Sequence, residues 1–193
     1  MSRSISFKRL AISPGILDPH APVSQARQVM LLWARSARAR GADALMIRER
    51  GLPGGELAAL MLELYPALQF IEIPILLAAS ELPAGIRADG IHHSADEQTP
   101  LPTDRALLYG RSCHSKKEVL AAMADGYDYV FYSPIFPTRS HPRAEPVGLA
   151  SLQEICTQVQ IPVFALGGIT ETTEDECLAA GARGVASIRR FMY

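Results

Sequence analysis

The sequence predicts one α/β domain over residues 1–193, folded as a TIM-type (β/α)8 barrel. Eight short apolar segments recur along the chain, and stretches with the spacing of an amphipathic helix separate several of them. A strand count near eight favours a closed parallel barrel over a flavodoxin-like open sheet, which stays the alternative. The hydrophobic content of 48% is enough for one sizeable core.

The predicted strands are short apolar runs, as expected for a parallel sheet that is covered on both faces. In chain order they are Phe7–Ser13, Ala44–Arg50, Ile73–Ala78, Gly90–Ser94, Leu107–Cys113, Tyr129–Pro134, Val163–Gly168 and Gly184–Ile188.

Apolar residues three and four positions apart predict helices at residues 23–37, 57–68 and 149–159. Two more helices are expected to begin near Lys116 and near Glu171. Glycine follows three of the helical segments, where a left-handed cap favours it, at Gly41, Gly126 and Gly181.

Two connections leave little room for a helix. Between Ser80 and Gly90 only a very short helix fits, and the threonine- and proline-rich stretch from Ser94 to Leu107 is expected to be a loop.

The chain stops directly after the eighth predicted strand, so a barrel lacking the last helix is expected. The outer faces of the first and eighth strands would then be uncovered. Phe191, Met192 and Tyr193 would join this apolar patch, and the patch predicts a homo-oligomer.

Composition excludes several classes of partner. The net charge is -1 and the pI is about 6.5, so no overall field attracts nucleic acid or an anionic membrane. No apolar run approaches the about 18 residues of a membrane span, and the first ten residues lack a signal-peptide core. The three cysteines are too widely spaced for a disulfide framework or a metal knuckle. A cytoplasmic protein is therefore expected.

The second predicted strand ends with two arginines on one face. Met46, Arg48 and Arg50 alternate along the strand and are expected to point into the mouth of the barrel. Neighbouring guanidinium groups favour a bound anion. The alternative is that Glu49 or another carboxylate pairs with them as a structural bridge.

The fifth predicted strand ends with a hydroxyl and an imidazole. Ser112 and His114 share a face, and together they are suited to orient a substrate and to move a proton. Alternatively, His114 caps the following helix or only supports its neighbours, and Cys113 is a small buried apolar residue.

The sixth predicted strand leads into a long loop that is rich in polar side chains. Thr138, Ser140 and His141 offer two hydroxyls and an imidazole within four residues. A loop of this length is suited to act as a lid over a substrate, although a solvated loop without function is the alternative.

The seventh predicted strand ends in Gly167 and Gly168, whose backbone amides are open to a phosphate. Barrel phosphate sites use the loops after the seventh and eighth strands, so Ser187 or Arg189 is expected to complete the site. The adjacent His92 and His93 on the fourth strand face opposite ways, so at most one points inward, and no metal site is predicted.

Matching blocks over nearly the whole chain resemble the thiamine phosphate synthase/TenI family. They are IRER (47–50), ADGIH (88–92), GRSCHS (110–115), SPIFPT (133–138), IPVFALGGI (161–169) and AGARGV. The resemblance implies a barrel that binds a phosphorylated heterocycle of the thiazole phosphate class. It also implies one of two activities: joining that thiazole to a pyrimidine pyrophosphate with Mg²⁺, or a metal-free tautomerisation of a thiazole carboxylate phosphate.

Departures from the family pattern bear on the reaction. The Asn-Asp-Asp run of the synthases, which holds Mg²⁺, is replaced by Leu77-Ala78-Ala79, and apolar residues cannot bind a hard cation. No cofactor is therefore expected unless synthase activity survives, in which case Mg²⁺ is needed. Pro134 stands where the tautomerase has its catalytic histidine, which leaves His114 or His141 to move the proton.

These observations favour a TenI-like protein of thiamine biosynthesis with tautomerase-type proton transfer. In this interpretation Arg48 and Arg50 hold a carboxylate, Ser112, Thr138 and Ser140 donate hydrogen bonds, and Gly167, Gly168 and Ser187 hold the phosphate. Thiamine phosphate synthase and a non-catalytic binding barrel are the alternatives.

Overall fold

The computed structural model describes residues 4–52, 54–78, 87–97, 99–102, 106–140 and 142–192. Eight parallel strands close into a barrel in sequence order, which confirms the predicted fold and rules out the open sheet. The strands are β1 (Arg9–Ile12), β2 (Ala44–Ile47), β3 (Ile75–Leu77), β4 (Gly90–His93), β5 (Leu108–Cys113), β6 (Tyr129–Tyr132), β7 (Val163–Leu166) and β8 (Gly184–Ser187).

Most strands end earlier than the apolar pattern predicts. β2, for example, ends at Ile47 rather than at Arg50. The amide of Arg48 donates to the hydroxyl of Ser13 at 2.8 Å instead of to a strand carbonyl, so the backbone leaves the ladder there. The residues that follow are thereby free to line the mouth of the barrel.

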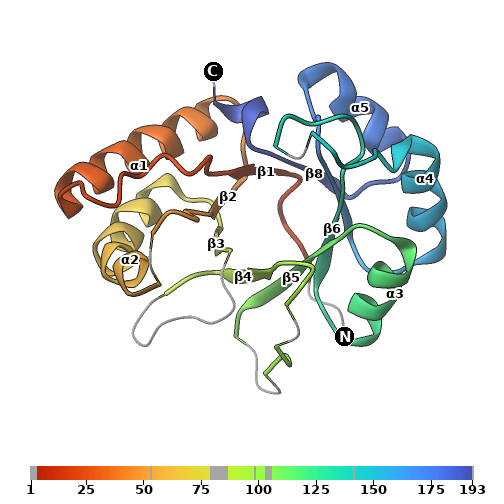
Figure 1. Cartoon of the computed structure of the whole chain (residues 1–193), viewed down its shortest axis with the longest axis horizontal. Helices are drawn as coiled ribbons and strands as arrows, with labels where there is room; N and C mark the ends of the chain where they lie inside the picture. The colour runs from red at the N-terminus through yellow and green to blue at the C-terminus, as the bar shows by residue number, and fades with distance from the viewer. Residues whose placement is uncertain are drawn as a thin grey trace.

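Five α-helices lie on the described part of the chain, on two sides of the barrel. Figure 1 shows α1 and α2 on one side, and α3, α4 and α5 on the other. Their bounds are α1 Val23–Ala39, α2 Gly54–Leu68, α3 Lys116–Ala124, α4 Gly148–Gln158 and α5 Glu171–Ala179. The short helix expected between Ser80 and Gly90 falls mostly outside the described residues, and the described part of 94–107 is loop before β5, as predicted.

At the amino-terminal end of the barrel, the same aspartate hydrogen bond joins three pairs of neighbouring strands. Asp43, Asp89 and Asp128 each stand directly before an even-numbered strand. Their carboxylates accept from backbone amides at the start of the preceding strand, from Arg9 at 2.6 Å, Ile75 at 2.8 Å and Tyr109 at 2.8 Å. The chemistry is therefore expected at the opposite, carboxyl end.

The barrel interior below the mouth is filled by side chains, among them the aromatic rings of Phe7, Tyr129, Phe131 and Phe164. The Tyr129 ring lies against Gly110, where an added Cβ would come within 2.1 Å of it. Because the interior is packed, a ligand has room only at the mouth.

The expectation for the end of the chain is wrong in one respect. Phe191 is fully buried and packs with the cluster that joins α1 and α2 to the barrel. The 3₁₀ helix η2 (Arg189–Phe191) folds back between α1 and α5 (Figure 1), because Ser187 Oγ accepts from the Arg190 amide and Arg190 pairs with Glu171 and Glu174. Met192 is half-buried, and Tyr193 lies outside the described residues.

None of the described helices is long and apolar enough to cross a membrane. Cys113 and Cys177 are buried, unpaired and apolar in their surroundings, as expected of small core residues. Burial raises the pKa of each of these two thiols to about 12, so both stay protonated at neutral pH.

Candidate functional site

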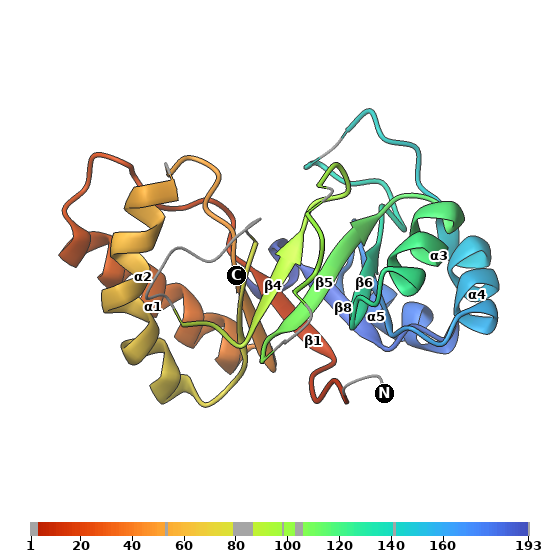
Figure 2. The same cartoon turned by 90° about the horizontal axis from the view of Figure 1, so that it is seen from below.

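A cavity of about 630 Å³ opens at the carboxyl ends of the strands. Figure 2 shows the loop after β6 lying at this end of the molecule. Every described site residue predicted from the sequence lines this one cavity: Arg48, Arg50, Ser112, His114, Thr138, Ser140, Gly167, Gly168 and Ser187. His141 lies outside the described residues, so its role stays a prediction.

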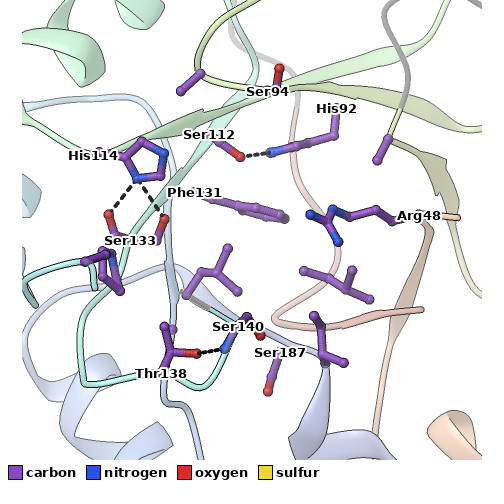
Figure 3. Close-up of a pocket in the computed structure, with 18 of the residues that line it drawn as sticks. Arg48, His92, Ser94, Ser112, His114, Phe131, Ser133, Thr138, Ser140 and Ser187 are labelled. Atoms are coloured by element: carbon purple, nitrogen blue, oxygen red, sulfur yellow. Dashed lines mark hydrogen bonds between the residues drawn. The ribbon is translucent and has the colours of Figure 1, made fainter. Parts of the chain in front are cut away.

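Arg48 brings a half-buried positive charge to the cavity (Figure 3). Among the described residues no carboxylate forms an ion pair with it. Burial, and next the neighbouring Arg50, lower the pKa of Arg48, although a guanidinium stays charged in proteins. An unneutralised cation in this position favours a bound anion.

The alternative role for Glu49, pairing with these arginines, does not fit the geometry. Glu49 is buried, and its Oε2 accepts from the Leu17 amide at 3.1 Å, so it fixes the loop after β1. Arg50 is exposed on the rim of the cavity. The guanidinium groups of the two arginines are therefore available to contact the solvent or a ligand.

His114 is oriented by a backbone carbonyl. Its Nδ1 lies 2.9 Å from the carbonyl oxygen of Ser133, which can only accept a hydrogen bond (Figure 3). In the neutral ring Nδ1 therefore carries the proton, and Nε2 keeps a lone pair that can accept a proton. The cap of α3 is Ser115, whose hydroxyl accepts from the Glu118 amide at 3.3 Å, so the helix-cap alternative for His114 is wrong.

His92 is a site residue that the sequence patterns did not single out. It points into the barrel, where its ring stacks on Phe131 at 4.0 Å and its Nε2 lies 2.9 Å from Ser112 Oγ (Figure 3). His93 faces the other way and meets the Tyr127 hydroxyl at 2.9 Å. Strand alternation predicted that at most one histidine points inward, but periodicity alone gave no signal to choose which.

The loop after β6 is closed at its base by backbone hydrogen bonds. The Val147 amide donates to the Pro134 carbonyl at 2.8 Å, and the Gly148 amide donates to the Ile135 carbonyl at 3.2 Å. Between these anchors Thr138 and Ser140 reach the cavity, with the Ser140 amide 3.4 Å from Thr138 Oγ1. Whether the loop moves as a lid stays a prediction.

The glycines after β7 have a packing role in addition to the predicted one. Gly167 and Gly168 have φ values of 97° and 69°, in the left-handed region. A Cβ on Gly167 would lie 2.7 Å from Pro134, and one on Gly168 would lie 2.6 Å from Phe136. Both glycines thus let the β6 loop approach β7, and both also line the cavity beside Ser187.

The end of β3 does not fit the Mg²⁺ position that the family resemblance implies. Leu77 is buried and Ala78 lines the cavity, whereas Ala79 lies outside the described residues. Within the described ranges no group of three His, Cys, Asp or Glu side chains is placed to hold a metal ion. Asp96 and Glu97 do reach the cavity from the loop after β4.

Known proteins match both the sequence and this geometry. The family model described as thiamine monophosphate synthase (TMP-TENI) matches residues 16–191. The chain belongs to the thiamine monophosphate synthase/TenI family. It is 34% identical over 157 residues to the putative thiamine-phosphate synthase 2 of Aquifex aeolicus, covering 79% of this chain and 84% of that protein.

Two further family members agree. The thiamine-phosphate synthase of Methanoculleus marisnigri is 38% identical over 170 residues, which is 80% of this chain and 76% of that one. The structure of thiamine phosphate pyrophosphorylase from Pyrococcus furiosus superposes with a TM-score of 0.76 at 26% identity, over 94% of this chain and 85% of that chain. The relatives from Aquifex aeolicus and Methanoculleus marisnigri carry the synthase name, and none of the three proteins supports the TenI branch specifically. The comparisons therefore favour the synthase alternative over the tautomerase interpretation.

Proposed function

We propose that this chain binds a thiazole phosphate in the mouth of the barrel and acts in thiamine biosynthesis. The observation that carries the proposal is the pairing, in one cavity, of a glycine-lined strand end with a half-buried arginine that has no carboxylate partner among the described residues. Such a cavity suits a ligand with a phosphate and a second anionic group.

In this proposal the thiazole phosphate binds at Gly167, Gly168 and Ser187, at the ends of β7 and β8. The exposed Arg189 adds a cation at the same end. Ser112, Thr138 and Ser140 then contact the heterocycle from β5 and from the β6 loop. Arg48 and Arg50 hold the second anionic group at the end of β2.

The first candidate reaction is that of thiamine-phosphate synthase, which the names of the relatives support. The thiazole nitrogen forms a bond to the pyrimidine methylene carbon, and pyrophosphate leaves with the electron pair of the broken C–O bond. Arg48 and Arg50 are the cations placed to compensate the charge that develops on the pyrophosphate. Mg²⁺ would supply further compensation, but the described residues at β3 do not fit its binding, so no step is assigned to it.

The second candidate is proton transfer on a thiazole carboxylate phosphate. The specific observation in its favour is the tautomer of His114, whose Nε2 lone pair is available while Nδ1 is held by the Ser133 carbonyl. His114 Nε2 would take a proton from one ring position and return it to another. Arg48 would hold the carboxylate during the transfer.

One set of assays separates the candidates. The purified protein is given thiazole phosphate with pyrimidine pyrophosphate, with and without Mg²⁺, and separately the thiazole carboxylate phosphate alone, followed by NMR. Formation of thiamine phosphate supports the synthase, and isomerisation without the pyrimidine supports the tautomerase. Calorimetric binding of thiazole phosphate without turnover supports the non-catalytic alternative, and the absence of binding contradicts the proposal.

His114→Asn sharpens the assay, because the asparagine amide can still donate to the Ser133 carbonyl but has no basic nitrogen. If His114 moves the proton, this variant isomerises the thiazole carboxylate phosphate about 10²- to 10⁴-fold more slowly. Its affinity for thiazole phosphate should stay unchanged. An undiminished isomerisation rate would remove His114 from this role.

A further inference from the structure

Two buried polar groups and one half-buried hydroxyl form a hydrogen-bonded relay from the barrel core to the cavity. Tyr129 on β6 lies 3.2 Å from Nδ1 of His92 on β4, and Nε2 of the same ring lies 2.9 Å from Ser112 Oγ on β5. Tyr129 is fully buried and His92 nearly so, whereas Ser112 is half-buried and lines the cavity. His92 also lines the cavity, but both of its ring nitrogens are engaged, by Tyr129 and by Ser112. Ser112 is therefore the member whose hydroxyl is left to hydrogen-bond a ligand.

The buried end at Tyr129 decides which groups donate and which accept in these two hydrogen bonds. Tyr129 is surrounded by aromatic rings, with Phe131 at 5.6 Å, Phe164 at 5.7 Å and Phe7 at 6.0 Å between ring centroids. Among the described residues its hydroxyl meets one hydrogen-bonding group, Nδ1 of His92. A phenol proton without an acceptor in such a core is costly, so Tyr129 donates and Nδ1 accepts.

The remaining directions are then determined. An imidazole that accepts at Nδ1 carries its proton on Nε2, which donates to Ser112 Oγ. Ser112 thus accepts from His92, and its own proton is left to point at the ligand. Burial supports the same assignment, because it lowers the pKa of His92 to about 3 and raises the pKa of Tyr129, so the imidazole stays neutral and the phenol stays protonated.

We propose that Tyr129 and His92 act as positioning residues that hold the hydroxyl of Ser112 as a hydrogen-bond donor toward the ligand. The ligand atom at that point is then an acceptor, such as an unprotonated ring nitrogen or a carboxylate oxygen, and an N–H group is disfavoured there. The inference deepens the proposed function, on which its ligand-binding part rests.

Residues on the strands place the Tyr129 hydroxyl next to the His92 ring. Gly110 leaves room for the Tyr129 ring, since a Cβ there would lie 2.5 Å from the phenol oxygen. Phe131 stacks on the imidazole and keeps its plane between the two hydroxyls. These contacts come from three neighbouring strands, β4, β5 and β6.

The first test reads the His92 tautomer in the free protein and needs no ligand. Protein labelled with ¹⁵N-histidine is examined by long-range proton–nitrogen NMR, with the five histidines assigned individually. The expected spectrum has His92 protonated on Nε2, bare on Nδ1 and neutral from pH 5 to pH 8. A proton on Nδ1, or an imidazolium in this range, would overturn the proposal.

The second test is a double-mutant cycle on the binding of thiazole phosphate, measured by calorimetry. Tyr129→Phe keeps the ring and removes the first donor, and Ser112→Ala removes the last. Each single variant is expected to bind about 2- to 10-fold more weakly, the value of one hydrogen bond. In the Ser112→Ala background, Tyr129→Phe should have almost no further effect, because Tyr129 acts through Ser112.

Tyr127→Phe is the matched control. It removes a Tyr–His hydrogen bond of similar geometry, 2.9 Å to Nδ1 of His93, on the side of β4 that faces away from the cavity. Its affinity for thiazole phosphate should equal that of the wild type. Additive losses from Tyr129→Phe and Ser112→Ala would sink the positioning role.

If the wild-type protein does not bind thiazole phosphate, the proposed function fails. The tautomer measurement still decides whether Tyr129 donates to His92 and His92 donates to Ser112. The cycle is then repeated with the pyrimidine pyrophosphate as the probe. Coupling between Tyr129 and Ser112 on that probe supports the positioning role, and its absence counts against it.

Discussion

Arg48 is a single residue whose surroundings favour a binding role. Most half-buried arginines in proteins gain a carboxylate, because an unpaired charge is costly to remove from water. Here burial, and next Arg50, lower the pKa of Arg48, and the negative charge of Glu49 offsets this only in part. The Glu49 carboxylate itself accepts a hydrogen bond from the Leu17 amide. The free-energy cost of burying this charge without an ion pair favours a role for Arg48 in binding an anionic ligand.

Arg48→Ala should therefore weaken the binding of thiazole carboxylate phosphate by about 2–3 kcal/mol, the cost of losing one partner of a desolvated charge pair. Arg50→Ala is the control, because Arg50 is exposed on the rim and its contribution is screened by water, and it should cost under about 1 kcal/mol. Calorimetric titration measures both. Equal affinities of Arg48→Ala and wild type would exclude this role.

His92 adds a pH dependence to folding. Its pKa is lowered to about 3 in the folded protein, chiefly by burial, from about 6.5 in an unfolded chain. Between these values the unfolded state binds more protons, so stability is complete above pH 6.5 and falls as the pH drops toward 3.

Urea unfolding at pH 7, 6 and 5 checks this prediction. The wild-type protein should lose up to about 1.4 kcal/mol per pH unit more than His92→Asn does, since the variant lacks the titrating group. The comparison with the variant removes the contribution of the other histidines and of the carboxylates. Parallel pH profiles for the two proteins would contradict the assignment.

At the scale of elements, the loop after β6 and the end of β7 form one packed unit. The Ile135 amide donates to the Leu166 carbonyl at 2.9 Å, and the Phe136 amide donates to the Gly167 carbonyl at 3.1 Å. A Cβ on Gly168 would lie too close to Phe136, and a Cβ on Gly167 would lie too close to Pro134. The glycines thus let the hydroxyl-bearing loop pack against the β7 end of the cavity, where the phosphate is proposed to bind.

Gly168→Ala should cost about 2–4 kcal/mol of unfolding free energy, because it combines a left-handed backbone with a close contact. Gly15→Ala is the matched control, since Gly15 has a φ of 75° and nothing within 4 Å of its added Cβ. The control should lose only about 1 kcal/mol. Denaturant unfolding compares them, and equal losses would mean that the contact with Phe136 can relax.

The elements were predictable wherever local pattern decides them. Short apolar runs located all eight strands, and apolar spacing with a period of 3.6 located the helices α1, α2 and α4, because the side chains of each segment decide directly which of its faces are buried. The aspartates before β2, β4 and β6 were not predicted as a group. Their partners are 14 to 35 residues away, so only the parallel register brings them together.

For the whole molecule, an ion-pair cluster lies beside β1 and β8, the strand pair that closes the barrel. Glu174 on α5 is buried and accepts from Arg9 Nε on β1 at 2.5 Å, and its Oε2 lies 3.4 Å from Nε of Arg190 on η2. Arg190 also meets the exposed Glu171 at 3.1 Å. The cluster thus links β1 and the C-terminal helix η2 to α5.

Glu174→Gln should lower the unfolding free energy by about 3 kcal/mol, because it leaves Arg190 largely buried beside a neutral group. Glu171→Gln removes the other carboxylate of Arg190, but Glu171 is 79% exposed, so its loss should stay under about 1 kcal/mol. Urea unfolding at pH 7 gives both values. A larger effect of Glu171→Gln than of Glu174→Gln would reverse the assignment.

The homo-oligomer stays a prediction, but its expected surface has changed. Phe191, the last residue of η2, is fully buried, so it cannot contribute to an exposed patch over β1 and β8. The large apolar side chains that are exposed on α1, α2 and the 3₁₀ helix η1 (Gln69–Ile71) that follows α2 are Val23, Leu32, Leu62 and Phe70. Light scattering of the purified chain gives its mass in solution and decides whether an oligomer forms.

The sequence by itself determined the barrel, the family and a set of polar residues and glycines that line the cavity. This was possible because strand alternation and the carboxyl ends of parallel strands are local, repeating features. The tertiary structure decided that His92 rather than His93 faces inward, that Glu49 turns away from Arg48, and that Phe191 is covered. Each of these depends on partners 32 or more residues apart or on strand register, which side-chain periodicity leaves open.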